Sequence, residues 1–253
     1  MLRLHFLIEV AKISDYSKNL CSHMCELLLM STNHVIRKDN RIVTACYSLT
    51  LNEQRLVVTA IAKIPFGKKV PEDIEITASE FLNLFPDIGE DNVYHVLKEA
   101  VDRLYERSII VENPIKRKKF RWIDAASTYY TGEGRVGFSF SRHIIPYLEQ
   151  LHSQFTMYRL NDISNLKSIY SIRLYEMMMQ FKEKGFIKIH IEKFKERIGV
   201  ENKYSTYKNL YARVIKPAVI ELNTKSLFTI TFTPIREGRA IKFLTFNFSE
   251  RSR

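Results

Sequence analysis

The same order of predicted secondary-structure elements occurs twice in this chain, and this internal repeat constrains the fold more than any other feature. Apolar spacing and turn residues predict a helix, a short strand, a short helix, a longer helix and a β-hairpin in each copy. The first copy comprises residues 48–64, 73–77, 78–85, 90–110 and 118–140. The second comprises residues 168–185, 186–191, 192–199, 204–223 and 228–248.

The two copies also match residue by residue. A shift of 113 residues superposes six apolar positions without a gap: Ile74 on Ile187, Ile76 on Ile189, Phe81 on Phe194, Tyr94 on Tyr207, Leu97 on Leu210 and Val101 on Val214. The first helices align with a shift of 118, which places Leu51 on Ile169, Arg55 on Arg173 and Leu56 on Leu174. Any two amphipathic helices share some apolar positions. The common order and the ungapped match nevertheless favour duplication of one domain.

Two helices followed by a hairpin form the winged-helix arrangement, so the sequence predicts an α+β fold with two tandem winged-helix domains. In such domains the second helix of the helix-turn-helix enters the DNA major groove and the hairpin wing follows the backbone. We expect an N-terminal extension over residues 1–32, a first domain over 33–150 that contacts DNA, and a second domain over 151–253 for the main DNA reading.

The charge distribution favours an anionic partner for the second domain. The net charge is +11, but residues 1–160 contain 21 Lys and Arg against 19 Asp and Glu. Residues 161–253 contain 18 against 9, so most of the excess lies there. This balance suits nucleic acid or an anionic membrane surface.

The longer helix of the second copy separates its side chains into two faces. At 100° per residue the apolar face holds Tyr207, Leu210, Tyr211, Val214 and Ala218, with Tyr204 and Leu222 at its edge. The opposite face, here called the reading stripe, contains no acid and consists of Lys203, Ser205, Thr206, Lys208, Asn209, Ala212, Arg213 and Lys216. Arg and Asn read purine bases, and Ser, Thr and Lys hold phosphates. An ordinary solvated face is the alternative, but such faces usually mix charges. Pro217 predicts a kink or a helix junction, because it leaves the carbonyl of Arg213 unpaired.

The first copy gives a more mixed picture. Its outer stripe holds Asn92, Val96, Glu99, Arg103 and Arg107. This mixture indicates weaker or shape-dependent DNA contact, or a protein partner. The basic run over 114–122 is either a solvated loop or the base of a wing that holds phosphates. We therefore add Asn92, Arg103, Lys116, Arg117, Lys118 and Lys119 to the predicted DNA-binding residues, together with Arg236, Arg239 and Lys242 of the second wing.

No pattern in the sequence indicates a catalytic centre, a cofactor or a metal. Cys21, His23 and Cys25 do not have zinc-ligand spacing, and the three cysteines suit a reducing cytosol. There is no phosphate-binding glycine loop before a Lys-Ser or Lys-Thr pair. The histidines form no His-x-His pair, which a nicking enzyme with a tyrosine nucleophile would need. No apolar run is long enough for a membrane span, and residues 1–30 lack signal-peptide features. We expect a cytoplasmic protein that is not an enzyme.

Several segments resemble the iteron-plasmid replication initiator (Rep) proteins. These are NHVIRKDNRIVTACYSLTLNEQRLVVTAI (33–61), FTMYRLNDISNLKSIYSIRLYEMMMQFK (155–182), FKERIGV (194–200), VIKPAVIELN (214–223) and GRAIKFLTFNF (238–248). The resemblance implies binding of monomers to direct repeats in origin DNA, with both winged helices on successive major grooves. It also implies dimers, joined through the first domain, that often bind an inverted repeat and repress their own gene. Origin opening and recruitment of the host initiator and replicative helicase are implied as well, without catalysis.

Carried over by position, the family's DNA-reading segment falls on residues 203–216. The family often has an Arg cluster in this helix. Here Tyr211 and Ala212 precede a single Arg213, so we expect different base preferences. The family usually begins near Asn33, which makes Met24 or Met30 a candidate natural start, with the preceding residues either not native or disordered.

Two other functions remain open at this point. A sequence-specific transcriptional regulator could use the same two domains, and a nicking replication enzyme belongs to a different class. Several direct repeats beside an AT-rich tract in the flanking DNA would favour an initiator. A single palindrome would favour a regulator, and a tyrosine attached covalently to a cleaved strand would establish the enzyme.

Overall fold

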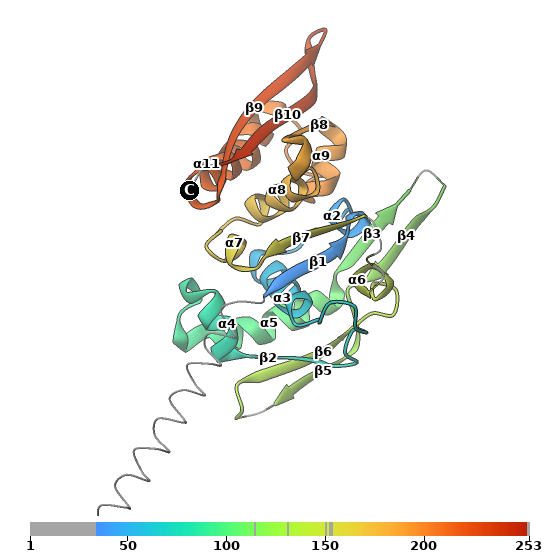
Figure 1. Ribbon diagram of the computed structural model, residues 1–253, viewed down its shortest axis with the longest axis vertical. Helices are drawn as coiled ribbons and strands as arrows, with labels where there is room; N and C mark the ends of the chain where they lie inside the picture. The colour runs from blue at the N-terminus through green and yellow to red at the C-terminus, as the bar shows by residue number, and fades with distance from the viewer. Residues whose placement is uncertain (1–33, 114, 131, 150, 152–153, 252–253) are drawn as a thin grey trace, which may run out of the picture. The chain divides into compact units, whose positions relative to one another are not determined.

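Each copy of the repeat folds into three helical elements and a three-stranded antiparallel sheet, so the two predicted winged-helix units are confirmed (Figure 1). The computed structural model describes residues 34–251, apart from 114, 131, 150, 152 and 153. The elements of the first unit are α3 (Leu51–Ala62), β2 (Ile74–Thr77), α4 (Ala78–Leu84), α5 (Val93–Glu106), β5 (Ile123–Tyr130) and β6 (Arg135–Phe140). Those of the second are α8 (Ile169–Gln180), β8 (Phe186–His190), α9 (Ile191–Ile198), α10 (Tyr207–Leu210), a π-helical segment (Tyr211–Ile215), α11 (Lys216–Lys225), β9 (Phe228–Glu237) and β10 (Ala240–Glu250).

The two sheets have the same topology. Their strand orders are β2-β6-β5 and β8-β10-β9, so in each unit the last strand lies between the short first strand and the other wing strand. Five of the six superposed apolar pairs are buried on both sides, and the tyrosine pair is half-buried in both units. The duplication inferred from the sequence is therefore present in the topology and in the core.

Other elements have no counterpart in the predicted repeat. Two strands, β1 (Val35–Asp39) and β7 (Phe155–Arg159), pair antiparallel between the two units (Figure 1). A second hairpin consists of β3 (Ser108–Glu112) and β4 (Arg117–Arg121). The described residues also form the short α-helices α2 (Asn40–Val43), α6 (Pro146–Glu149) and α7 (Asn161–Ser164), and 3-10 turns at Pro86–Ile88, Glu90–Asn92 and Lys182–Lys184. Because β1 and β7 pair, residues 35–253 form one compact unit. The predicted domain boundary at residue 150 stays a prediction.

Hydroxyl side chains fix the starts of the main helices. Thr50 and Glu53 form a reciprocal capping box at the start of α3. Thr77 caps α4, Ser168 caps α8 and Thr206 caps α10, each by accepting a hydrogen bond from a backbone N–H of the first turn. These caps place the helix-turn-helix elements in register with the sheets.

A buried ionic cluster lies where α8 meets β1, β7 and α3. The carboxylate of Glu176 is fully buried and accepts hydrogen bonds from Lys38, from Tyr158 at 2.6 Å and from Gln54 at 3.2 Å. Its second oxygen pairs with Arg173 at 3.0 Å. Burial opposes ionisation of Glu176, but the two cations and the hydrogen bonds lower its pKa below the ordinary value. The cluster therefore joins both units through one carboxylate.

Some predictions fall outside the described residues, including those on the extension, on Cys21, His23 and Cys25, and on the start at Met24 or Met30. Within the described part of the chain, each helix is too short or too polar to cross a bilayer.

Candidate nucleic-acid interface

The second helix-turn-helix consists of α9, a turn and the helix that runs from Tyr207 to Lys225. All eight residues of the reading stripe are exposed. Its four cations, Lys203, Lys208, Arg213 and Lys216, make no ion pair within the described residues. The hydroxyl of Thr206 accepts from the backbone N–H of Asn209, so this side chain also begins the helix. The stripe therefore presents unneutralised positive charge on a capped helix.

The discontinuity predicted at Pro217 takes the form of a π-helical turn. The backbone N–H of Lys216 donates to the carbonyl of Tyr211, five residues earlier. Pro217 has no N–H to donate, which favours this wider turn over an uninterrupted α-helix. The extra residue in the turn changes the helical phase, and as a result both Val214 and Ile215 are buried.

Tyr211 corrects the predicted core face. Its position on the apolar side predicts burial, but the side chain is 37% exposed. The ring lies between Tyr207 and Phe232, with ring centroids 6.0 and 5.8 Å away. The matched position of the first copy holds Lys98, a polar residue. This difference in the sequence could have indicated that the side chain of Tyr211 is exposed.

The second wing also carries free cations. The hairpin of β9 and β10 extends from the body of the molecule (Figure 1). Arg236, Arg239 and Lys242 lie near its tip, are exposed, and make no ion pair within the described part of the chain. Gly238 makes the turn with φ of +63°, a left-handed conformation that favours glycine. The wing thus adds basic side chains beyond the reading stripe.

The first helix-turn-helix has no comparable stripe. Arg103 pairs with Glu99 at 2.6 Å on the same helix. Arg107 binds the buried carboxylate of Glu53 with two hydrogen bonds of 3.0 Å, so it stabilises the start of α3. Asn92 is exposed at the start of α5, beside exposed acidic residues. The outer face of the first helix-turn-helix therefore carries both charges, as the sequence predicted, and acidic side chains neutralise Arg103 and Arg107.

The basic run over 114–122 does not belong to the first wing. That wing is the β5–β6 hairpin, whose Arg135 is held by Glu75 and Glu133 at 2.5 and 2.7 Å. Residues 117–121 instead form β4 of the separate β3–β4 hairpin. The interpretation of residues 114–122 as the base of a wing was therefore wrong. In the second copy α11 leads directly to β9, so comparison of the two copies could not indicate the extra β3–β4 hairpin.

Two buried arginines at matched positions hold the helix-turn-helix turns. Arg55 donates to the carboxylate of Asp87 at 2.9 Å and to the carbonyl of Leu166 at 3.3 Å. Arg173 donates to the carbonyl of Arg197 at 2.7 Å and to the carbonyl of Ala45 at 3.0 Å. Each arginine therefore connects its own turn to the neighbouring unit. The sequence comparison superposed this pair without indicating its role.

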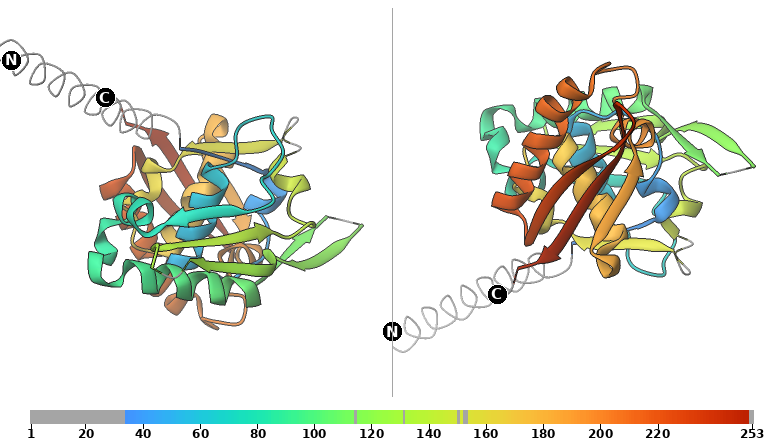
Figure 2. Two further views of the ribbon diagram at one scale, coloured as in Figure 1. Left: turned by 90° about the horizontal axis from the view of Figure 1, so that it is seen from below. Right: turned by 90° about the horizontal axis from the view of Figure 1, so that it is seen from above.

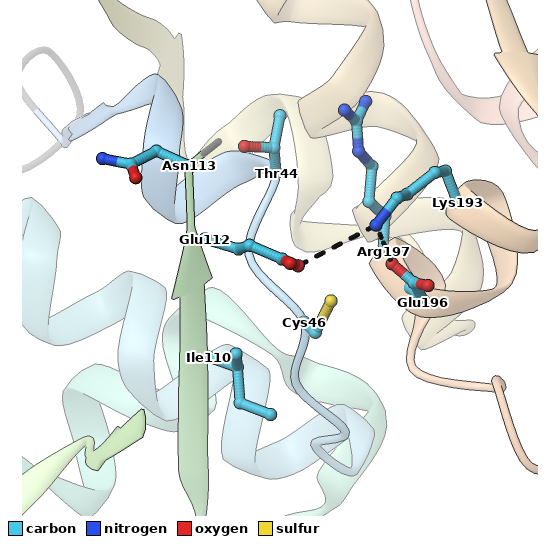
Figure 3. A pocket seen from close by; sticks show the side chains of 8 residues that line it. All are labelled: Thr44, Cys46, Ile110, Glu112, Asn113, Lys193, Glu196 and Arg197. Carbon is cyan, nitrogen blue, oxygen red and sulfur yellow. Dashed lines mark hydrogen bonds and ion pairs between the residues drawn. The ribbon is translucent and has the colours of Figure 1, made fainter. Parts of the chain in front are cut away.

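A cleft of about 310 Å³ separates the β3–β4 hairpin from α9 (Figure 3). Lys193 extends into it and pairs with Glu196 at 2.8 Å and with Glu112 at 3.8 Å. Burial raises the pKa of the Cys46 thiol in the same cleft, which disfavours the nucleophilic thiolate. No cluster of metal-ligand side chains occurs among residues 34–251 as far as they are described. The cleft is a mixed-charge contact between the hairpin and the second helix-turn-helix.

Two family models match the chain in succession. The model described as initiator replication protein, WH1, matches residues 35–179, and the model described as initiator Rep protein, WH2, matches residues 190–248. The chain belongs to this initiator replication protein family. The two matched regions contain the two helix-turn-helix elements described above.

Known proteins agree with this assignment. A replication initiation protein from Escherichia coli is 30% identical over 202 residues, which are 76% of this chain and 63% of the relative. The chain thus spans less than two thirds of that relative's length. An uncharacterized 27.6 kDa protein from Escherichia coli is 23% identical over 215 residues, covering 78% of this chain and 88% of the relative.

Among solved structures, the Pi initiator protein in complex with iteron DNA is similar with a TM-score of 0.74. It is 22% identical and covers 87% of this chain and 99% of that chain. At this identity the likeness shows the fold.

Proposed function

We propose that this protein is a plasmid replication initiator that binds repeated sites in double-stranded origin DNA. The observation that carries the proposal is the reading stripe, an exposed and acid-free helix face with four unpaired cations. The initiator family and the iteron complex of the Pi protein support the same function. In this proposal Arg213 and Asn209 contact bases, and the lysines contact phosphates.

The wider activity follows from the same assignment. The chain binds direct repeats as a monomer, promotes opening of the origin and recruits the host initiator and replicative helicase. As a dimer in equilibrium with the monomer it binds an inverted repeat and represses its own gene. It acts without a catalytic centre and without a cofactor. A transcriptional regulator with the same helices is the second candidate, and the arrangement of repeats in the flanking DNA separates the two.

The test is Arg213→Ala in a footprinting titration on the plasmid's origin DNA. Loss of a contact to a base or buried phosphate weakens specific binding by about 1–3 kcal/mol, or about 5- to 150-fold. Arg41→Ala is the control, because Arg41 is exposed on α2 and pairs with Asp39 at 2.7 Å. Its affinity should remain within about twofold of the original. Unchanged binding of the Arg213 variant, with the fold intact by circular dichroism, would remove Arg213 from the site.

A further inference from the structure

We propose that the β3–β4 hairpin is a separate DNA-contacting arm, distinct from both wings and both helix-turn-helix elements. This inference rests on the proposed function, because the arm would contact the same DNA duplex as the reading stripe. The arm's cations would follow the phosphate backbone while its tip, Ile115, enters the minor groove. Figure 1 and both views of Figure 2 show the hairpin projecting from the body of the molecule.

The arm carries concentrated positive charge with no internal compensation. Four consecutive residues, Lys116, Arg117, Lys118 and Lys119, are exposed and make no ion pair within the described residues. Glu112 is opposite Arg117 in the strand register, but its carboxylate pairs with Lys193 of α9. Four free cations on a narrow two-stranded ribbon suit a linear polyanion.

At the tip of the arm, the side chain of Asn113 binds the backbone of Ile115 and Lys116, and Ile115 is an exposed apolar residue. The side-chain carbonyl of Asn113 accepts from the backbone N–H groups of Ile115 at 3.0 Å and Lys116 at 2.7 Å. Ile115 is 97% exposed, the highest value among the large apolar side chains that the structure describes. Apolar residues beside cations on a projecting element are the wedges that minor-groove proteins insert between base steps.

The base of the arm fixes its direction. Phe120 packs against the ring of Tyr147, with centroids 6.0 Å apart, and Ile109 opposite it is fully buried. Arg117 and Lys119 lie on the other face, because they pair with Glu112 and Ile110, which line the cleft beside α9. Glu112 on that face lies beside Lys193 of α9 (Figure 3), so the arm is next to the winged-helix unit that carries the reading stripe.

A second copy of this chain fits the arm less well than DNA. Pairing of two β4 edges would bring lysines and arginines of both copies together, and like charges opposite each other destabilise a sheet. Lysines on an exposed edge strand normally prevent such pairing. Charge therefore favours the polyanion, and self-association becomes an outcome of the test.

The experiment compares the salt dependence of binding for three full-length proteins. The arm variant carries Lys116→Gln, Arg117→Gln, Lys118→Gln and Lys119→Gln. The control carries Lys63→Gln, Lys68→Gln, Lys182→Gln and Lys184→Gln, which lowers the net charge equally at exposed positions. The probes are a duplex selected by the unmodified chain from a random pool, and a duplex of random sequence.

Each lost phosphate contact lowers the slope of log affinity against log salt by about 0.9, so four contacts lower it by roughly 3 to 4. Between about 50 and 200 mM NaCl, the unmodified chain should lose about 100-fold more affinity than the arm variant on both duplexes. The control should keep the slope of the unmodified chain.

Hydroxyl-radical footprinting of Ile115→Ser tests the tip separately. We expect loss of one minor-groove protection while the protections made by the reading stripe remain. An arm variant with the slope of the control would overturn the proposal. If the arm variant keeps the salt slope of the unmodified chain but changes its oligomeric state in analytical ultracentrifugation, the surface binds a second copy of this chain instead. If the chain selects no sequence at all, the proposed function fails, while the slope on random duplex still decides the arm.

Discussion

Substitution of the buried carboxylate Glu176→Gln should destabilise the whole unit from Val35 to Arg253. The amide keeps the shape and can still accept from Tyr158 and Gln54, so the change mainly removes charge. Arg173 retains the carbonyls of Ala45 and Arg197 as acceptors. Lys38, in contrast, is fully buried, and Glu176 is its one ion-pair partner among the described residues.

The expected cost comes mainly from Lys38, which is left buried without an ion pair while Arg173 keeps its carbonyl acceptors, and is about 3–5 kcal/mol. Urea unfolding followed by circular dichroism measures it as a lower midpoint at unchanged m-value. The double variant Lys38→Met and Glu176→Gln removes the charges of Lys38 and Glu176, leaves Arg173 on its two carbonyl acceptors, and should recover more than half of the loss. A single-variant cost below about 1 kcal/mol, or a double variant no more stable than the single, would refute the reasoning.

The pKa shift of Glu176 also predicts how the stability of the folded protein depends on pH in acid. The pKa of Glu176 is lower in the folded protein than its ordinary value of 4.5. Its contribution is therefore complete above the unfolded-state pKa and is lost as the pH falls through the folded-state pKa. The unmodified protein should lose stability below about pH 4.5 more steeply than Glu176→Gln.

Two further substitutions test the turn and the cap that position the helices. Gly199→Ala should cost more stability than Gly238→Ala, although both glycines have positive φ, because an added Cβ at Gly199 lies 2.3 Å from the carbonyl oxygen of Tyr47 and one at Gly238 meets nothing within 4 Å. Thermal melts should show a loss of about 1–2 kcal/mol for the Gly238 variant and a larger loss for the Gly199 variant. Equal losses would contradict the close approach at Gly199. Thr50→Ala removes the capping box of α3 and should cost about 1 kcal/mol in urea unfolding, with Ser205→Ala, an exposed position that caps no helix, as the control.

Local patterns predicted the repeated elements because each carries its own periodicity and its own turn residues. The match of Ile74 to Ile187 and of Phe81 to Phe194 required only the sequence, and both pairs occupy the core. Pairing of β1 with β7 could not be predicted in this way. Val35 and its partner Arg159 lie far apart in the chain, and neither short strand shows which other strand it joins.

The reading stripe was predicted more completely than the side chains at its edge. A wheel at 100° per residue placed Arg213 and Lys216 outward, where the structure also has them. The same wheel placed Tyr211 inside, where the structure has it 37% exposed, and it did not place Ile215 in the core, because it assumes a uniform α-helix. The π turn over Tyr211–Ile215 breaks that assumption, and the sequence signals it only through Pro217. Contact of the stripe with DNA stays a prediction.

The two copies differ in where the described residues leave cations without an ion pair, and we expect this difference to give the copies two roles on DNA. In the first copy, Arg103 and Arg135 are neutralised on the helix and wing, and unpaired cations are concentrated on the β3–β4 arm. In the second copy, the unpaired cations lie on the reading helix and its wing. Contacts to phosphates do not distinguish sequences, whereas Arg and Asn on a helix in the major groove can. Loss of the arm should therefore weaken binding equally on selected and random duplexes, and loss of Arg213 should act mainly on the selected one.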